Sequence, residues 1–180
     1  MARVPYPARD DLPEAQRPIY DRMQRERGVP TGHIFLALAN VPHLLDPILT
    51  MAGALRNDTV IDRRYRELAV LMVGLISRSA YEFDHHWNAA LQAGVRREQL
   101  EALAEFETSP VFHDQERAVL RFASEITRTG EVADATWTEL RRYFDIRQSM
   151  EIQLTVAWYN CVIRILLPLQ IEHEDWFERK

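Results

Sequence analysis

The spacing of apolar residues constrains the fold of this chain more than any other feature. Apolar residues recur at intervals of three and four along nearly the whole sequence, and no run of four or more residues alternates cleanly between apolar and polar. The first pattern places apolar side chains on one face of an α-helix, whereas a half-buried β-strand requires the second. The sequence therefore predicts an all-α protein, a compact helical bundle.

The expected helices are separated by residues that end or cap them. Pro5 and Pro7 block a helix, so residues 1–10 are expected to form an extended arm. Gly28 and Gly94 each predict the end of a helix. The periodic segments predict helices at 12–27, 31–39, 44–55, 62–77, 79–93, 96–105, 114–129, 134–143 and 147–171, with a bend or interruption at Pro168.

Two of these helices carry more specific expectations. Asp62 is a good N-cap for the helix that follows it. From Leu68 onward that helix is apolar on nearly every side, which predicts burial on several faces. Pro47 fits best within the first turn of the helix expected over 44–55.

Length and charge limit the possible functions. With 180 residues, one domain is expected, in which residues 1–30 form an N-terminal extension with one helix and residues 31–180 form the core helical domain. The net charge is −5 and lysine and arginine form no run, so neither nucleic acid nor an anionic membrane is an expected partner. The apolar run at 68–76 is shorter than the roughly 18 residues that a membrane span requires.

The single cysteine and the N-terminus both indicate a cytoplasmic protein. Cys161 cannot form an intrachain disulfide, which fits a reducing compartment, and the N-terminus has no apolar segment typical of a secretory signal. We expect Cys161 to be a small buried hydrophobic residue.

Histidine and carboxylate residues converge only once in the sequence. Glu82 is followed by His85 and His86 at i+3 and i+4, so the three side chains can share one helix face. A carboxylate beside an imidazole raises the pKa of the histidine and fixes its tautomer, which suits acid–base catalysis near neutral pH.

Three other interpretations of this segment remain open. The pair could be a solvated Glu–His pair on a wet helix face. Ser79 and Glu82 also match a capping box, in which Glu82 reaches back to the backbone N–H of Ser79. Glu82 and His85 match the Glu-x-x-His unit of di-iron bundles, but no second unit occurs, so no metal is expected.

Motifs across roughly residues 30–170 resemble the carboxymuconolactone decarboxylase family, which shares its fold with alkyl hydroperoxide reductase D-type peroxidases. The resemblance is carried by Arg63-Arg-Tyr-Arg-Glu67, Ser79-x-Tyr-Glu-Phe-x-x-His86 and Ala-Trp-Tyr159-Asn160-x-x-x-Arg164. The peroxidase branch has Cys-x-x-Cys at the positions of Ser79 and Glu82. Because a thiol peroxidase requires a thiolate and a resolving partner, that activity is not expected here.

The decarboxylase branch lacks those cysteines, as this chain does. Its resemblance implies a carboxy-lyase that removes CO₂ from a small carboxylated lactone or related organic acid and needs no organic cofactor. In such a reaction His86 is our candidate proton donor, Glu67 orients or charge-pairs it, and Glu82 assists proton transfer. Two alternatives remain, namely a redox protein without the cysteine pair and a non-catalytic binding protein of the same fold.

Five further residues are candidates for binding the substrate. Arg164 either clamps the substrate carboxylate or forms a salt bridge to Glu67 or to another helix. Ser79 combines its capping role with a place in the site. Tyr81, His33 and Trp158 either line the pocket or serve only in packing.

The resemblance also implies an assembly. It predicts a homo-oligomer of three or six subunits, and the largely apolar segments 68–76 and 154–167 offer interfaces for it.

Overall fold

The computed structural model describes residues 1–180, and every regular element in it is helical. The prediction of an all-α protein is therefore confirmed. The chain forms two compact units, the first made of residues 1–58 and 166–177 and the second of residues 59–165 and 178–180. The boundaries of these units differ from the boundary at residue 30 that the sequence suggested. The division into an N-terminal extension and a core helical domain at residue 30 stays a prediction.

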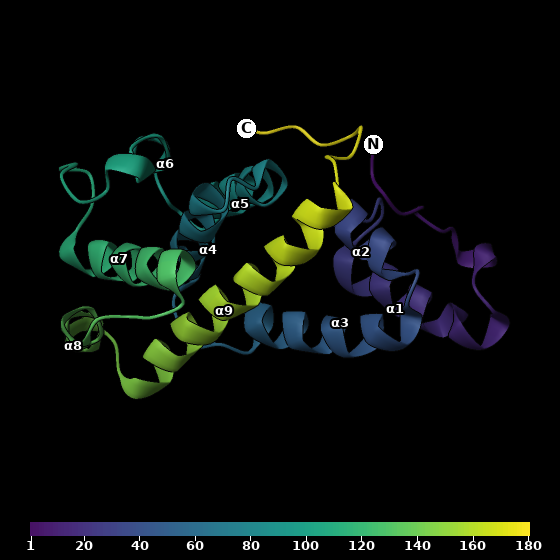
Figure 1. The fold of residues 1–180 in the computed structure, drawn as a ribbon, viewed down its shortest axis with the longest axis horizontal. Coiled ribbons are helices and arrows are strands. Elements are labelled where there is room, and N and C mark those ends of the chain that lie inside the picture. The colour runs from purple at the N-terminus through teal and green to yellow at the C-terminus, as the bar shows by residue number, and fades with distance from the viewer. The chain divides into compact units, whose positions relative to one another are not determined.

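The first unit is built around α3. Its elements are the 3-10 helices η1 (Arg9–Asp11) and η2 (Glu14–Gln16) and the helices α1 (Arg17–Arg27), α2 (His33–Leu38) and α3 (Pro42–Asn57). Helices α1 and α2 both pack against α3 (Figure 1).

The second unit is built around α4. Its elements are α4 (Arg63–Ile76), α5 (Ala80–Gln92), α6 (Arg97–Glu101), η3 (Leu103–Glu105), α7 (Asp114–Thr129) and α8 (Asp134–Tyr143). Helix α4 packs against both α5 and α7, and α8 packs against α7 (Figure 1). Helix α9 (Ile146–Leu169) belongs to this unit through residue 165.

Helix α4 behaves as its sequence predicts. The Asp62 side chain accepts a hydrogen bond from the backbone N–H of Arg64 and so caps the first turn. Every residue of α4 from 66 to 74 is buried, since α5 and α7 cover different parts of its surface. The apolar composition all around the helix is thus explained by burial.

Proline accounts for the main differences between the expected and observed helices. Helix α1 begins at Arg17 rather than near residue 12, with Pro18 in its first turn. Helix α3 begins at Pro42, so Pro47 lies inside it and not in its first turn as expected. Helix α9 contains Pro168 and ends one residue later. Because proline has a fixed φ and no N–H, it fits a helix start readily, and its position within a periodic segment does not reveal where that helix begins.

Helix α9 also meets the length and hydropathy criteria of a membrane span, which the apolar run at 68–76 does not. Its most apolar 18 residues have a mean hydropathy of 1.4, and 33% of them are buried. A single helix of this kind is weak evidence for a membrane, because core helices of soluble proteins meet the same criteria. The structure is compatible with a soluble protein.

Helices α4 and α5 lie close together at Gly74. A Cβ atom added there would lie 3.3 Å from both the backbone nitrogen and the Cα of Phe83. The backbone carbonyl of Gly74 also accepts a hydrogen bond from the N–H of Ser79, the N-cap of α5. Gly74 therefore lets the start of α5 lie directly against the end of α4.

We expect the Gly74→Ala variant to be less stable than the Gly53→Ala variant. Both glycines lie inside helices, where Gly→Ala alone adds about 1 kcal/mol to the free energy of unfolding. Gly53 has open space around it, so Gly53→Ala should show this gain. In Gly74→Ala the close contact of the new Cβ with Phe83 should cost about 1–3 kcal/mol, which cancels or reverses the gain. Urea denaturation of both variants measures the difference, and equal gains would contradict the close approach.

Candidate functional site

The imidazole of His86 lies between two carboxylates. Its Nδ1 is 2.6 Å from Oε2 of Glu67 on α4, and its Nε2 is 3.0 Å from Oε1 of Glu82, one turn earlier on α5. The side chains of His86, Glu67 and Glu82 are 12%, 5% and 7% exposed, respectively. The structure thus brings together the three residues for which the sequence predicted catalytic roles.

The two contacts define the protonation state of His86. A neutral imidazole has one N–H and one lone pair, so it can donate to only one carboxylate. The other nitrogen would then direct its lone pair at a carboxylate oxygen. Protonated His86 donates to both Glu67 and Glu82, and this form satisfies both short contacts.

Charge and burial act in opposite directions on His86. Burial by itself lowers the pKa of the imidazole. The negative charge of Glu67, together with hydrogen bonds to Glu67 and Glu82, outweighs burial and raises the pKa of His86 to about 9. His86 therefore holds its proton throughout the neutral range.

Two arginines on α4 add positive charge beside Glu67. The Arg63 Nε is 3.7 Å and the Arg66 Nη2 is 3.5 Å from the Glu67 Oε1 atom. Burial raises the pKa of Glu67, but the charge and hydrogen bond of His86 and the charges of Arg66 and Arg63 lower it below its usual value. The Arg63–Glu67 spacing of i, i+4 was visible in the sequence, and it indicates such a pair.

The capping alternative for Glu82 is now decided by geometry. Ser79 is buried and caps α5, since its Oγ accepts a hydrogen bond of 3.5 Å from the backbone N–H of Glu82. The N–H of Ser79 donates to the carbonyl of Gly74 and is not available to the Glu82 carboxylate. Glu82 therefore bonds to His86 and does not complete a capping box.

Tyr159 is a neighbour of His86 for which the sequence predicted no role in the site. Its ring on α9 meets the imidazole edge-on, with ring centroids 4.8 Å apart and an interplanar angle of 81°. A ring placed this way fixes the orientation of the imidazole. Tyr159 lies 73 positions beyond His86 in the sequence, so no local spacing reveals the contact.

Arg164 makes neither of the ion pairs considered from the sequence. Its Nη1 donates to the backbone carbonyl of Asn160 at 2.7 Å and to the Asn160 Oδ1 at 2.9 Å, one turn earlier on α9. The residue itself is exposed. Arg63 and Arg66 are instead the cations beside Glu67.

The remaining candidates for substrate binding have contacts of their own. Tyr81 is buried and its ring stacks on His85 at 4.2 Å between centroids. His33 belongs to the first unit, where its ring stacks on Tyr6 and its Nδ1 lies 2.8 Å from the carbonyl of Glu172. Trp158 is half-buried on α9. Their roles in substrate binding stay predictions.

Cys161 differs from expectation. It is exposed on α9 and not a buried hydrophobic residue. Its burial was inferred from residue type alone, whereas the face of a helix that packs is set by its neighbours.

No set of three or more histidine, cysteine, aspartate or glutamate side chains has the arrangement of a metal site.

Comparisons with known proteins support the resemblance found in the sequence. The carboxymuconolactone decarboxylase family matches residues 42–125. No curated protein matches the chain. The family match and the similarity to several solved structures together confirm the resemblance.

Those solved structures share the fold. A cysteine-to-alanine variant of the debrominase Bmp8, in complex with 2,3,4-tribromopyrrole, superposes with a TM-score of 0.80 at 21% identity, covering 96% of this chain and 91% of its own. An alkylhydroperoxidase AhpD core protein from Ralstonia eutropha JMP134 has a TM-score of 0.80 at 20% identity, covering 97% and 93%. A peroxidase-related protein from Silicibacter sp. TM1040 gives the same score and identity, covering 97% and 92%. At these identities the likeness establishes the fold, which is that of the alkyl hydroperoxide reductase D type.

The raised pKa of His86 predicts how stability depends on pH. The unfolded histidine titrates near 6.5 and the folded one near 9, so the stabilisation is complete below pH 6.5 and is lost as the pH rises through 9. At about 1.4 kcal/mol per pH unit, the loss should reach roughly 3 kcal/mol.

Urea denaturation between pH 6 and pH 10 measures this loss. His86→Gln should remove the pH dependence in this window, whereas the same change at the exposed His43 should leave it intact. An equal alkaline loss of stability in wild type and His86→Gln would contradict the charged state of His86.

Proposed function

From the match of residues 42–125 to the carboxymuconolactone decarboxylase family, we propose that this protein is a cofactor-free carboxy-lyase. Its substrate is a small carboxylated lactone or a related organic acid. The observation that carries the proposal is the protonated imidazole of His86, held between Glu67 and Glu82. Such a group is a proton donor at neutral pH.

Decarboxylation requires a proton at one particular step. The bond between the ring carbon and the carboxylate breaks, and CO₂ leaves as a neutral molecule. The electron pair of that bond delocalises onto the lactone carbonyl as an enolate. A proton must then be delivered to carbon, and the reaction consumes one proton from solvent for each CO₂ released.

His86 supplies that proton in the proposed mechanism. Glu67, the more closely bonded carboxylate at 2.6 Å, orients the ring and stabilises its charge. Glu82 accepts the other N–H at 3.0 Å, and it either passes the proton onward or turns aside so that Nε2 faces the substrate. Water then reprotonates His86.

The substrate carboxylate requires a cation near the site. Arg164 remains our candidate for this clamp, because the residue is exposed and Asn160 engages only its Nη1. Arg63 is a second candidate, since its side chain is 47% exposed and its Nε lies 3.7 Å from Glu67. A loosely held carboxylate is favourable here, because strong pairing would stabilise the charge that decarboxylation removes.

Thiol peroxidase chemistry receives no support from this site, although several solved structures with this fold are described as peroxidase-related. The chain has one cysteine, and it lies exposed on α9 rather than beside His86. Ser79 and Glu82 occupy the positions of the cysteine pair. The Bmp8 variant holds a small heteroaromatic ring, which supports a small cyclic substrate for this fold.

We expect purified protein to release CO₂ from carboxymuconolactone. His86→Gln should lower the rate about 100-fold or more, which is the range for loss of a general acid. Wild-type release should also decline as the pH rises through 9, where His86 loses its proton. Trapping of CO₂ during turnover measures both effects.

The neighbouring His85 offers a matched control for this experiment. His85→Gln removes an imidazole from the same helix, one that stacks on Tyr81 and places its Nδ1 2.8 Å from the Tyr81 carbonyl. It should retain release near the wild-type rate. Full release by a folded His86→Gln variant would refute the proton-donor assignment, and absence of release in the wild type would refute the substrate.

The resemblance further leads us to propose a homo-oligomer of three or six subunits. The segment 68–76 is largely covered by the chain's own helices and does not offer the interface that the sequence suggested. Support comes instead from α9, where Ile146, Met150 and Leu154 are 57%, 45% and 43% exposed. Ala157 and Cys161 continue the same helix face and are also exposed. An uncharged face of this length on one helix suits an interface between copies of the chain.

Leu154→Glu should dissociate the oligomer, because it places a charge at the centre of this face. Sedimentation equilibrium at micromolar concentration measures the mass. Thr138→Glu, which adds the same charge at an exposed position of α8, should leave the oligomer intact. A monomeric wild type, or equal dissociation of both variants, would contradict this interface.

A further inference from the structure

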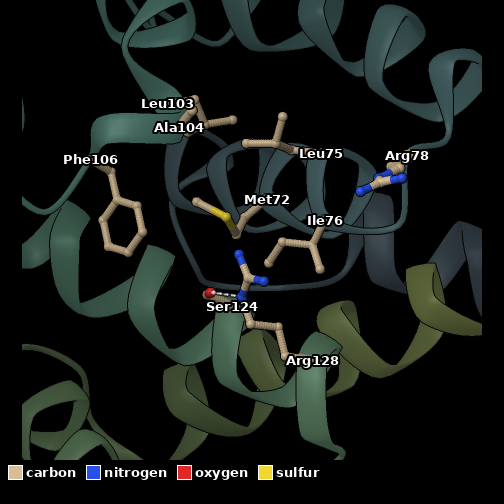
Figure 2. A pocket seen from close by; sticks show the side chains of 9 residues that line it. All are labelled: Met72, Leu75, Ile76, Arg78, Leu103, Ala104, Phe106, Ser124 and Arg128. Atoms are coloured by element: carbon tan, nitrogen blue, oxygen red, sulfur yellow. Dashed lines mark hydrogen bonds between the residues drawn. The ribbon is translucent and has the colours of Figure 1, made fainter.

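A cavity lies in the unit that contains His86, between α4, the segment around η3, and α7. Its volume is about 250 Å³. It is open to solvent, and six of its nine lining residues are apolar. The lining side chains, drawn in Figure 2, are Met72, Leu75, Ile76, Arg78, Leu103, Ala104, Phe106, Ser124 and Arg128. None of Glu67, Glu82 and His86 belongs to this lining.

The only charged side chains that line the cavity are two arginines. Arg128 reaches from α7 toward Met72 and Ile76, and its Nε donates a hydrogen bond of 3.2 Å to the Ser124 Oγ (Figure 2). Arg78 lies at the α4 end of the cavity (Figure 2). Both residues are exposed, and neither guanidinium has a carboxylate partner in the protein, so the pocket combines apolar side chains with two positive charges that a ligand can reach.

The position of Arg78 is fixed by the turn that ends α4. The φ of Arg78 is +55°, in the left-handed region that side chains with a Cβ seldom adopt. Glycine would occupy this position without that cost, which is about 1 kcal/mol or more. The N–H groups of Arg78 and Ser79 donate to the carbonyls of Leu75 and Gly74, so this conformation ends α4 and holds Arg78 at one end of the pocket.

We propose that this cavity binds an amphipathic carboxylate, a small organic acid with an apolar body. The apolar part would contact Met72, Leu75 and Ile76, and the carboxylate would bridge Arg78 and Arg128. Guanidinium groups pair with carboxylates through parallel N–H bonds, which an uncharged ligand cannot match. This binding site is independent of the proposed lyase activity.

The volume sets the size of the ligand. An apolar cavity of about 150 Å³ holds benzene, so a cavity of this volume accommodates about ten non-hydrogen atoms. Octanoate has this size and carries one carboxylate. Octanol has nearly the same apolar body and no charge, so comparison of the two isolates the contribution of the arginines.

Isothermal titration calorimetry with octanoate tests the proposal on the full chain. We expect one saturable site, with octanol binding at least about tenfold more weakly. Arg128→Gln and Arg78→Gln should each weaken octanoate binding about tenfold and leave octanol binding unchanged. Ala104→Phe, which fills the cavity and keeps both charges, should abolish binding of both ligands. Circular dichroism confirms that each variant is folded.

Two further variants serve as controls for the specificity of this site. Arg142→Gln removes an exposed arginine of α8 and should not change the affinity for octanoate. His86→Gln should not change it either. Absence of octanoate binding in the wild type would overturn the proposal. The proposal would also be overturned if Arg78→Gln and Arg128→Gln left the affinity for octanoate unchanged. It would be overturned as well if Arg142→Gln or His86→Gln weakened octanoate binding as much as those two variants do.

Discussion

The pair of hydrogen bonds from His86 to two buried carboxylates is the interaction on which the candidate site depends. A buried charge is costly unless it is paired, and here each ring nitrogen finds a carboxylate oxygen at 2.6 or 3.0 Å. The pairing requires α5 to lie close to α4 at a fixed register. Gly74 permits that approach, and Ser79 begins α5 at the correct position.

The same interaction distinguishes this site from the one that the resemblance implies for the peroxidase branch. Where the peroxidase branch has its second cysteine, this chain has Glu82, one turn from His86. A thiol there would serve electron transfer through a disulfide, whereas a carboxylate can only accept hydrogen bonds and protons. Glu82 therefore completes the set of hydrogen-bond partners of the charged His86 imidazole, the arrangement on which the proposed proton transfer depends.

Sequence spacing predicted the helix starts and the pairs within one helix. It did not predict which of two possible partners a side chain binds. The start of α4 at Asp62, the cap at Ser79 and the i, i+4 pair of Glu82 and His86 all follow from helix geometry. Glu82 had two possible partners within one turn, and spacing could not choose between them. The contact of Tyr159 with His86 joins distant helices, and the exposure of Cys161 depends on which face of α9 packs. Both are set by tertiary structure.

The apolar character of α4 accounts for the cavity as well as for the site. A helix that is apolar on every side must be covered on every side, and α5 and α7 provide most of that cover. Two of the residues that line the pocket beside α4, Ala104 and Ser124, have small side chains and leave the pocket open. This pocket of about 250 Å³ is open to solvent, so the half-buried side chains of Leu75 and Ile76 remain accessible to water or to a ligand. A ligand bound here would shield these apolar side chains from water while its carboxylate pairs with the guanidinium of Arg128.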